Sequence, residues 1–309
     1  MANKKNIMLS IIIVSFNTNK ILKSCIDSVI KNSGNLKYEF VIVDNNSTDG
    51  SVAYLKRLSQ YKNVKVVFNR TNVGYGGANN QGINRALGDY LLFLNSDTYF
   101  EKNILKKMVD YLKKHPHIGC ISCMLKNSDG TIQGTGGYFP NLLGVFSWML
   151  IQDFPFIDRL IKPFHPMKSR SFFKGTGFYL HEKELDWVTG AFMLMRKKAV
   201  NDTGLFDPHY FMYMEEVDYL FRMKKKGWKV LYKPDWSIVH LGGKSGSAGS
   251  GILLEFEGVK IFYKKHYPKW QYALLRVILK TGAFWRMCIF GLLKGKVDFT
   301  VYAKAFQQI

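Results

Sequence analysis

An α/β fold built on a mostly parallel, doubly wound sheet is the class that this sequence predicts. Residues 9–95 alternate between short apolar runs rich in β-branched side chains and segments with helical spacing. The apolar runs lack a polar alternation, as expected of parallel strands that are covered on both faces. Polar or glycine-rich segments follow these runs, and ligands in such sheets bind beyond the carboxyl ends of the strands.

Four strands with helices between them are predicted in this first part of the chain. The strands are expected at residues 9–16, 40–43, 64–68 and 90–94. Apolar side chains at helical spacing predict a helix at 19–31 and another at 51–60, and a third helix follows a glycine-rich loop. Strand and helix alternate at the interval that is typical of a doubly wound sheet.

The pattern changes after these elements. Residues 138–167 are aromatic and apolar and predict a long excursion, either a lid over a site or a surface for a lipid-linked substrate. A strand at 187–195 returns to the sheet pattern, and a helix at 215–226 and a short strand at 229–232 follow. The composition of residues 242–251 predicts a flexible loop, and the chain beyond it is helical and basic.

Charge and cysteine content narrow the function classes. The formal net charge of +21 favours polyanions, namely nucleic acid, an anionic membrane surface or a phosphorylated substrate. No nucleic-acid-binding signature is found, so nucleic acid is not expected as a partner. Cys120 and Cys123 lie in an apolar run that predicts a buried strand rather than a zinc site. The sequence has no signal-peptide pattern and no apolar window that could span a membrane, so we expect a cytoplasmic protein.

The C-terminal region is unusually basic. From Lys260 onward the sequence has ten Lys and Arg residues and one acidic residue, Asp298. Aromatic and aliphatic side chains recur among them at helical spacing. This pattern predicts an interfacial amphipathic helix on anionic lipid, and the alternative is a helix pair packed on the preceding domain. We therefore expect residues 247–309 to attach the protein to the inner face of the cell membrane.

The candidate ligand-binding residues lie at four predicted strand ends. They are Ser15 and Asn17, then Asp44 and Asn46, then Asn72, Gly76 and Asn80, and finally Asn95 and Asp97. An aspartate at the second strand end can accept a hydrogen bond from a base or a ribose, and glycines let the backbone approach a bulky ligand. Asp97 ends a buried run, where a carboxylate is costly unless it binds a cation, and such a cation could hold a diphosphate.

The order of these segments resembles the inverting family 2 glycosyltransferases of the Rossmann-like GT-A fold, especially their rhamnosyltransferase-type members from bacterial surface polysaccharide assembly. The segments that carry the resemblance are IIIVSFN, VIVDNNSTDGS, NVGYGGANNQGI, GDYLLFLNSDT, WVTGAFMLMRK, FMYMEEVDYLFR and VHLGGKSG. We expect residues 1–246 to form the catalytic domain. The resemblance implies a nucleoside-diphosphate sugar donor, first dTDP-rhamnose and second a UDP-hexose, and a lipid-linked saccharide acceptor.

The resemblance also implies roles for single residues. The nucleotide sugar is expected to contact Ser15, Asn17, Asp44, Asn46, Asn72, Gly76, Asn80, Asn95 and Asp97. Asn95-Ser96-Asp97 occupies the position of the family's DXD metal motif, with Asn in place of the first Asp. Asp97 and His240 are the expected ligands of a divalent cation, Mn²⁺ or Mg²⁺, and an imidazole ligand suits Mn²⁺ better.

The family's acidic pair corresponds to Glu215 and Glu216, and the resemblance points to Glu216 as the catalytic base, with Glu215 as the second choice. Inverting transfer needs a carboxylate that takes the proton of the acceptor hydroxyl. Two adjacent carboxylates raise the pKa of one of them, which suits a base. The alternative for this pair is a solvated helix start. Asp218 and Arg222, one helical turn apart, predict a supporting ion pair.

The acceptor side of the resemblance falls on Trp187, Thr189 and Gly190. A tryptophan ring stacks well on a sugar, although a core tryptophan is the alternative at this position. A catalytically silent protein that binds nucleotide sugar or polysaccharide with the same fold is the rival function. Asp97, Glu216 and His240 favour the enzyme, since the rival needs neither a base nor a metal.

Overall fold

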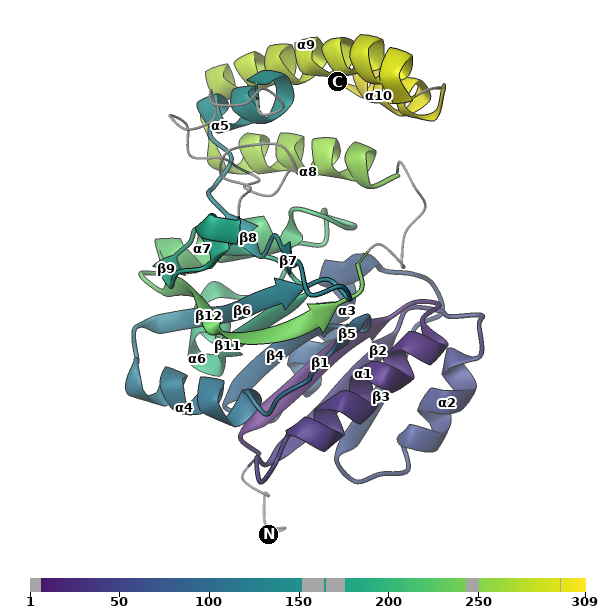
Figure 1. The fold of residues 1–309 in the computed structure, drawn as a ribbon, viewed down its shortest axis with the longest axis vertical. Helices are drawn as coiled ribbons and strands as arrows, with labels where there is room; N and C mark the ends of the chain where they lie inside the picture. Colours follow the sequence, from purple (N-terminus) through teal and green to yellow (C-terminus); the bar gives the residue numbers. More distant parts are fainter. Residues whose placement is uncertain (1–6, 152–163, 165–175, 243–249, 295) are drawn as a thin grey trace.

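A ten-stranded mixed sheet forms the centre of the molecule in the described part of the chain (Figure 1). The computed structural model describes residues 7–151, 164, 176–242, 250–294 and 296–309. The sheet runs in the order β3 (Val64–Phe68), β2 (Tyr38–Asp44), β1 (Leu9–Ser15), β4 (Tyr90–Asn95), β11 (Phe192–Arg196), β6 (Ile118–Lys126), β12 (Lys229–His240) and β5 (Thr98–Tyr99). Two short strands complete it, since β7 (Ile132–Gln133) pairs with β6 and β9 (Lys183–Glu184) pairs with β12.

The main strands are mostly parallel, which confirms the predicted fold class. β1 pairs in parallel with β2 and β4, β2 with β3, and β6 with β12. β11 is antiparallel to both of its neighbours, β4 and β6. The sheet therefore has a parallel half at the N-terminal strands, and the polar strand ends that were singled out in the sequence belong to this half.

Two predicted strands differ from the observed ones. The prediction of one strand at 187–195 is wrong, because β10 (Trp187–Val188) pairs with β8 (Gly136–Gly137) in a separate two-stranded sheet and β11 begins only at Phe192. The chain leaves the strand at Gly190, whose carbonyl accepts a hydrogen bond from the Tyr75 hydroxyl. The strand predicted at 229–232 continues to His240 after a register shift that contains Pro234, a residue without a backbone donor.

Successive side chains along each strand point to opposite faces of the sheet and pack into two separate apolar cores. Leu9, Ile11 and Ile13 of β1 face helices α1 (Asn19–Asn32), α2 (Ser51–Leu58) and α4 (Leu105–Lys114). Ile12 faces the opposite side, where α3 (Gly74–Arg85), α6 (Lys197–Thr203) and α7 (Glu215–Lys225) cover the sheet. This period of two explains why the strand is apolar at every position.

The C-terminal region forms a helical layer on top of the sheet body (Figure 1). It consists of α8 (Ser250–His266), α9 (Lys269–Lys294) and α10 (Lys296–Gln308), together with α5 (Leu142–Phe146) and the π-helix η1 (Ser147–Ile151). A short 3₁₀ helix, η4, spans Thr176–Tyr179. Helix α8 lies between the sheet body and the other helices, and its buried Phe256, Val259 and Phe262 share a core with α7.

The predicted excursion and the predicted tail thus pack on one another. α5 and η1 contact α9, and the Arg286 guanidinium of α9 donates hydrogen bonds to the carbonyls of Trp148 and Met149. The rest of the predicted excursion, residues 152–163 and 165–167, lies outside the described residues. The same holds for most of the predicted loop at 242–251 and for the expected domain boundary at 246.

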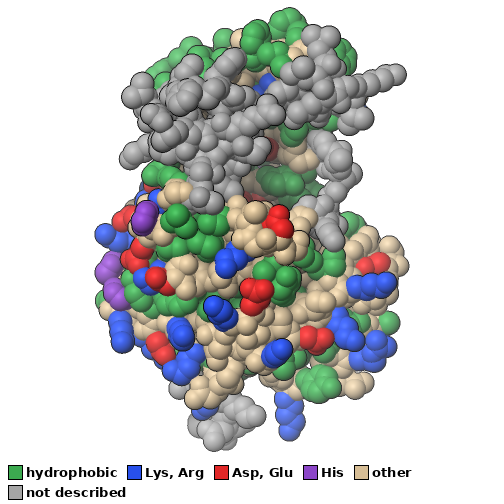
Figure 2. Space-filling model, viewed as in Figure 1, with side chains coloured by type: hydrophobic (Ala, Val, Ile, Leu, Met, Phe, Trp, Pro, Cys, Tyr) green, Lys and Arg blue, Asp and Glu red, His purple; other side chains and the backbone are tan. Residues whose placement is uncertain are grey.

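One side of α9 exposes apolar side chains, and Figure 2 shows hydrophobic groups on the outer surface of the helical layer. The exposed apolar residues are Trp270, Leu274, Val277, Phe284 and Trp285. Their spacing places them on one face, opposite the buried Leu275 and Leu279. Lys269, Arg276 and Lys280 are also exposed and form a row beside this apolar face. Within the described residues, no helix is both long and apolar enough to cross a membrane.

Candidate functional site

The predicted strand ends meet at one edge of the sheet. In the register of the parallel strands, Ser15 pairs with Asp44, and Val14 pairs with Asn95. Asp97 follows two residues after β4. The parallel pairing therefore brings polar groups from three separate segments of the sequence to the same place.

A buried carboxylate with one open oxygen lies at the end of β2. Asp44 is buried, its Oδ2 accepts a hydrogen bond from the Ser47 amide at 3.0 Å, and its Oδ1 has no partner among the described residues. Asn17 and Asn46 beside it both have positive φ, at 54° and 72°. Strained backbone of this kind concentrates at binding sites. Asp44 Oδ1 is thus an acceptor held ready for a ligand N–H or O–H group.

Other predicted nucleotide-binding residues make contacts within the protein. The Ser15 hydroxyl lies 3.2 Å from that of Thr18, and Asn72 Oδ1 accepts the Gly74 amide at 2.9 Å. Asn80 uses both ends of its amide on the backbone of Phe206, at 2.8 Å each. Gly76 faces the side chains of Phe206 and Glu215. These residues shape the walls of the site, and Asn80 has both of its polar side-chain atoms occupied.

Asp97 and His240 lie side by side, although they come from distant segments. His240 Nε2 is 3.2 Å from Asp97 Oδ1 and 3.5 Å from Asn95 Nδ2. Gln133, which the sequence analysis did not single out, orients the ring. Its Nε2 donates to the His240 carbonyl at 2.7 Å, so its Oε1, 2.8 Å from His240 Nδ1, accepts the ring proton. Nε2 is then the ring nitrogen that faces the Asp97 carboxylate.

A carboxylate oxygen and an imidazole nitrogen at this distance form an ion pair when the ring is protonated, and with a neutral ring they are a donor set that fits Mn²⁺ or Mg²⁺. Asp97 is buried, which makes an uncompensated charge costly. In the described part of the chain, no group of three or more His, Cys, Asp and Glu side chains is placed to hold a metal. A cation here would therefore take its remaining ligands from the bound substrate or water.

The acidic pair begins α7, directly after Tyr213 and Met214, which both have positive φ. Glu215 is 4% exposed, and burial followed by the charge of Glu216 raises the pKa of Glu215 well above its ordinary value. The solvated helix start that was the alternative for this pair is wrong for Glu215.

Tyr75 connects the acidic pair to the Asp97 region. Burial raises the pKa of its hydroxyl, and the charges of Glu215, Glu216 and Asp97 raise it further. Its hydroxyl donates to the Gly190 carbonyl at 2.7 Å, and a Cβ atom on residue 190 would come within 2.9 Å of that hydroxyl. Gly190 therefore fixes the position of the Tyr75 hydroxyl, because its carbonyl accepts the hydrogen bond and its missing side chain leaves room for the ring.

Glu216 faces a pocket of about 410 Å³. Its described lining residues are Gly134, Gly136, Tyr179, Trp187, Thr189, Tyr213, Glu216, Gly251, Ile252 and Glu255. Trp187 and Thr189 thus lie where an acceptor would meet Glu216, and Trp187 Nε1 donates to the Tyr138 carbonyl at 3.0 Å. Gly251, Ile252 and Glu255 come from α8 and were missed, because the sequence gave no reason to place α8 beside the acidic pair.

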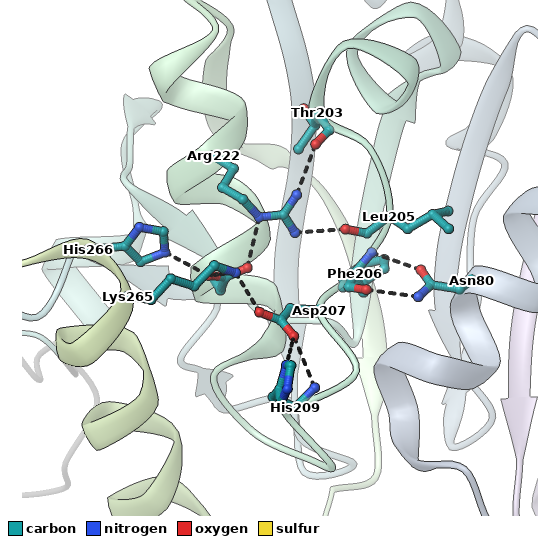
Figure 3. Close-up of polar contacts among 10 residues, drawn as sticks. Asn80, Thr203, Leu205, Phe206, Asp207, His209, Arg222, Lys265 and His266 are labelled. Carbon is teal, nitrogen blue, oxygen red and sulfur yellow. Dashed lines mark hydrogen bonds and ion pairs between the residues drawn. The ribbon is translucent and has the colours of Figure 1, made fainter.

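A buried ion network holds α7 in place (Figure 3). Asp218 is fully buried and contacts Arg222 Nε at 2.9 Å, Lys265 Nζ at 2.8 Å and His266 Nε2 at 2.7 Å. Arg222 also donates to the carbonyls of Thr203 and Leu205. The predicted ion pair of Asp218 and Arg222 is confirmed, and the structure adds two basic residues of α8 to it.

The fold and this site define a GT-A glycosyltransferase, in which a carboxylate-rich edge of a Rossmann-like sheet lies next to an acidic pair. The sequence model of glycosyl transferase family 2 matches residues 10–204, and the chain belongs to this family. Its full-length relatives include the N-acetylglucosaminyl-diphospho-decaprenol L-rhamnosyltransferase of Mycobacterium tuberculosis, 25% identical over 78% of this chain and 79% of the relative. Rhamnosyltransferase WbbL of Escherichia coli is 22% identical over 75% and 83%.

Solved structures share the fold. The mannosyltransferase PcManGT from Pyrobaculum calidifontis, in complex with GDP-mannose and Mn²⁺, matches with a TM-score of 0.55 and 14% identity over 96% of this chain and 73% of that chain. GalNAc-T7 with UDP, GalNAc and Mn²⁺ matches with a TM-score of 0.56 and 20% identity over 84% and 50%. At these identities the likeness concerns the fold alone, and it agrees with the predicted GT-A class.

Proposed function

We propose that this glycosyltransferase moves rhamnose or another hexose from a nucleoside-diphosphate sugar to a lipid-linked saccharide, with inversion at the anomeric carbon. The single observation that carries the proposal is the pairing of Asp97 with His240 at the edge of the sheet where β2 ends in Asp44, a buried carboxylate with one open oxygen. The rhamnosyltransferase relatives support rhamnose as the first choice of sugar, with dTDP as its carrier and a UDP-hexose second.

Asp44 is the proposed contact of the nucleotide base or ribose. Its free Oδ1 accepts a hydrogen bond, and burial of the carboxylate makes that bond stronger than one in water. Ser15, Asn17 and Asn46 surround it as the proposed base and ribose pocket, and Asn72, Gly76 and Asn80 form the wall near the sugar. Asn95 and Asp97 are the proposed residues at the diphosphate.

Asp97 and His240 are the proposed ligands of a divalent cation. When bound, such a cation supplies positive charge against the charge that develops on the departing nucleoside diphosphate. The chain contributes the rigid arrangement of the two ligands, since Gln133 fixes the tautomer and the orientation of His240. The Mn²⁺ in the related solved complexes supports Mn²⁺ as the first metal to test.

Glu216 is the proposed catalytic base. It faces the pocket, and a carboxylate there can take the proton of the acceptor hydroxyl as that oxygen attacks the anomeric carbon. Glu215 is the weaker candidate, because it is buried and its raised pKa favours the protonated form, which cannot accept a proton. Trp187, Thr189 and Gly190 are the proposed acceptor side of the site.

The exposed apolar face of α9 is the proposed membrane contact. Its aromatic and aliphatic side chains, with the row of Lys269, Arg276 and Lys280 beside it, have the pattern of a helix that lies in the interface of an anionic bilayer. A peripheral position on the inner face of the cell membrane would bring the enzyme to a lipid-linked acceptor, the substrate class named for the mycobacterial relative.

Donor binding is tested by thermal denaturation with a panel of nucleotide sugars, with and without Mn²⁺. A donor at 100 times its Kd stabilises the folded protein by about 2.7 kcal/mol, which gives a clear shift of the melting midpoint. We expect a selective shift with dTDP-rhamnose that depends on Mn²⁺. No shift with any nucleoside-diphosphate sugar would overturn the proposal.

Catalysis is tested with the donor found in this panel and a synthetic N-acetylglucosaminyl-diphospho-lipid, with mass spectrometry of the product. Glu216→Gln separates the enzyme from the rival, a catalytically silent sugar-binding protein. We expect this variant to bind the donor as the unaltered protein does but to form no product. Donor binding with no transfer by the unaltered protein would favour the silent binding protein.

A further inference from the structure

The segment 207–214 leads directly into the acidic pair, and its backbone is strained at the end. Its last two residues, Tyr213 and Met214, have positive φ angles of 66° and 69°, which residues with side chains rarely adopt. A backbone of this kind persists only where the surrounding structure holds it in place. The position of Glu215 and Glu216 at the start of α7 therefore depends on the contacts that this segment makes.

Lys265 of α8 connects the two ends of this segment (Figure 3). Its Nζ lies 2.6 Å from Oδ2 of Asp207, the first residue of the segment, and 2.8 Å from Oδ1 of Asp218, in the first turn of α7. The same Nζ lies 6.0 Å from the centre of the ring of Tyr210, a buried residue within the segment. One ammonium group therefore holds the beginning of the segment and the beginning of the catalytic helix together.

The two carboxylates that Lys265 joins are shielded from water. Asp218 is fully buried, and 15% of the Asp207 side chain is exposed. Burial alone would raise the pKa of both, but hydrogen bonds from Lys265 and from neighbouring histidines outweigh burial and lower both pKa values. Ion pairs are less screened in such a place than on an open surface, so these two constrain the backbone on either side of the acidic pair.

Two glycines pack against the same segment from other elements. A Cβ atom on Gly258 of α8 would come within 2.7 Å of Met214 Cβ. A Cβ atom on Gly74 would come within 2.4 Å of the Phe211 carbonyl oxygen, which accepts a hydrogen bond from the Tyr75 amide at 2.9 Å. The strained turn is thus enclosed by α3 and α8, and Lys265 supplies the charged contact of α8 with it.

We propose that Lys265 is a positioning residue for the catalytic base. By binding Asp207 and Asp218 together, it sets the conformation of the segment and thereby the direction in which Glu216 enters the site. Lys265 acts through the backbone of α7 and does not touch the substrate. The C-terminal helical layer then takes part in catalysis as well as in the proposed membrane contact. The inference rests on the proposed function, because it takes Glu216 as the base.

The first test is hydrogen exchange, followed by mass spectrometry, of the full-length protein without any substrate. It compares Lys265→Met, which removes the charge, with Lys265→Arg, which keeps it. Lys198→Met is the matched control, since Lys198 pairs with Asp202 at 3.0 Å on the exposed surface of α6. We expect the amides of residues 207–218 to exchange at least about tenfold faster in Lys265→Met and at the unaltered rate in the other two variants, because loss of a buried ion pair favours local opening.

The second test is steady-state transfer with the donor found in the thermal panel. We expect kcat of Lys265→Met to fall at least about tenfold with an unchanged KM for the donor, because a displaced catalytic group loses rate but not substrate binding. Lys265→Arg should recover most of kcat. A lysine that only stabilised the fold would lower the melting temperature and leave kcat per folded molecule unchanged, with folded molecules counted by donor binding.

Unaltered exchange of residues 207–218 in Lys265→Met would overturn the inference, as would an unaltered kcat per folded molecule. If Lys265→Met does not fold, Asp207→Asn takes its place, because it breaks the bridge at one end and leaves the contacts of Asp218 intact. The same increase in exchange and the same fall in kcat are then expected. No transfer by the unaltered protein would instead contradict the proposed function, while the exchange measurement, which needs no substrate, still decides whether Lys265 holds the segment.

Discussion

His266 Nε2 lies 2.7 Å from Oδ1 of Asp218, and this contact joins α8 to the helix that carries the acidic pair. Lys265 contacts the same oxygen and also reaches Asp207 at 2.6 Å (Figure 3). Asp218 lies one helical turn beyond Glu215, so the network holds the turn on which both catalytic candidates are placed. Helix α8 of the helical layer is therefore linked by ion pairs to α7, the helix that carries the acidic pair.

Replacing Asp218 by Asn is expected to destabilise the protein by about 3 kcal/mol, because the carboxylate is fully buried and its removal leaves three basic groups without their counter-charge. Of these groups His266 is buried, and Arg222 and Lys265 are partly exposed. The measurement is chemical denaturation of the full chain. Asp110→Asn is the matched control, since Asp110 pairs with Lys106 on the exposed surface of α4, where such pairs contribute about 0–1 kcal/mol. Equal losses in the two variants would show that the network adds nothing to stability.

The same carboxylate gives a pH dependence. Burial alone would raise the pKa of Asp218, but hydrogen bonds from His266 and Lys265 and the charge of Arg222 outweigh burial and lower the pKa below its ordinary value. The stabilisation is therefore present above the unfolded-state pKa of about 3.9 and is lost as the pH falls below it. We expect the difference in stability between the unaltered protein and Asp218→Asn to shrink as the pH falls from 5 to 3. A constant difference over that range would contradict this assignment.

Glu216→Gln and Glu215→Gln are expected to differ sharply in activity. Loss of a general base reduces kcat by roughly 10²–10⁴-fold, so Glu216→Gln should lose transfer while it retains donor binding. Glu215→Gln puts a neutral amide of the same shape in place of a buried carboxyl whose pKa is raised, and it should keep most of the activity. Steady-state kinetics of both variants decide between the two residues, and the reverse order of effects would make Glu215 the base.

Glu215 also predicts a stability effect of the opposite sign to that of Asp218. Its pKa is raised in the folded state, so the folded protein loses stability relative to the unfolded chain as the pH rises above the unfolded-state pKa of about 4.3. Glu215→Gln removes this loss and is expected to melt at a higher temperature than the unaltered protein at pH 7. Melting curves at pH 3 provide the control, because Glu215 is then protonated in both the folded and the unfolded chain.

The sequence predicts the parallel half of the fold and the strand-end residues because local patterns determine them. A continuous β-branched run identifies β1, and parallel pairing then brings Ser15 beside Asp44 without further information. Gln133 and Glu255 could not be found in this way. Gln133 contacts His240, and Glu255 lines the pocket of Glu216, so each is near residues that are remote in the chain.

The error at 187–195 comes from packing that the local sequence does not show. Residues 187–195 carry the β pattern throughout, and only the packing of Tyr75 on Gly190 explains the break. The basic tail gave two alternatives, and the structure contains features of both, since α9 is buried on one side and exposes apolar residues on the other. Patterns of composition cannot divide one helix into a packed face and a free face before its neighbours are known.

Gln133→Leu is expected to weaken the dependence of donor binding on Mn²⁺. The substitution removes the group that fixes the His240 tautomer, and loss of such a partner costs about 10–100-fold in metal affinity. The measurement is the Mn²⁺ concentration that gives half of the thermal shift with dTDP. Gln81→Leu, on α3, is the control for loss of a glutamine side chain. An unchanged Mn²⁺ dependence in Gln133→Leu would show that His240 is oriented without it.

The apolar face of α9 predicts binding to anionic lipid vesicles. A variant with Trp270→Ser, Leu274→Ser and Trp285→Ser should lose most of its binding to vesicles of phosphatidylglycerol and phosphatidylcholine in a flotation assay, because these side chains supply the apolar area. A second variant, with Lys269, Arg276 and Lys280 replaced by Gln, should bind about a hundredfold more weakly, since each basic residue near such a surface contributes about 1 kcal/mol.

Two controls distinguish a specific contact of α9 with the vesicle from non-specific hydrophobic or electrostatic binding. Tyr61→Ser with Leu87→Ser removes exposed apolar residues of the sheet body and should leave vesicle binding unchanged. Vesicles of phosphatidylcholine alone should bind all proteins weakly, because the basic row then has no anionic partner, and 1 M salt should weaken binding to anionic vesicles in the same way. Equal losses in the α9 and sheet-body variants would show that α9 is not the contact. The apolar face would then be free for another partner, and the acceptor would have to reach the α8 pocket from solution.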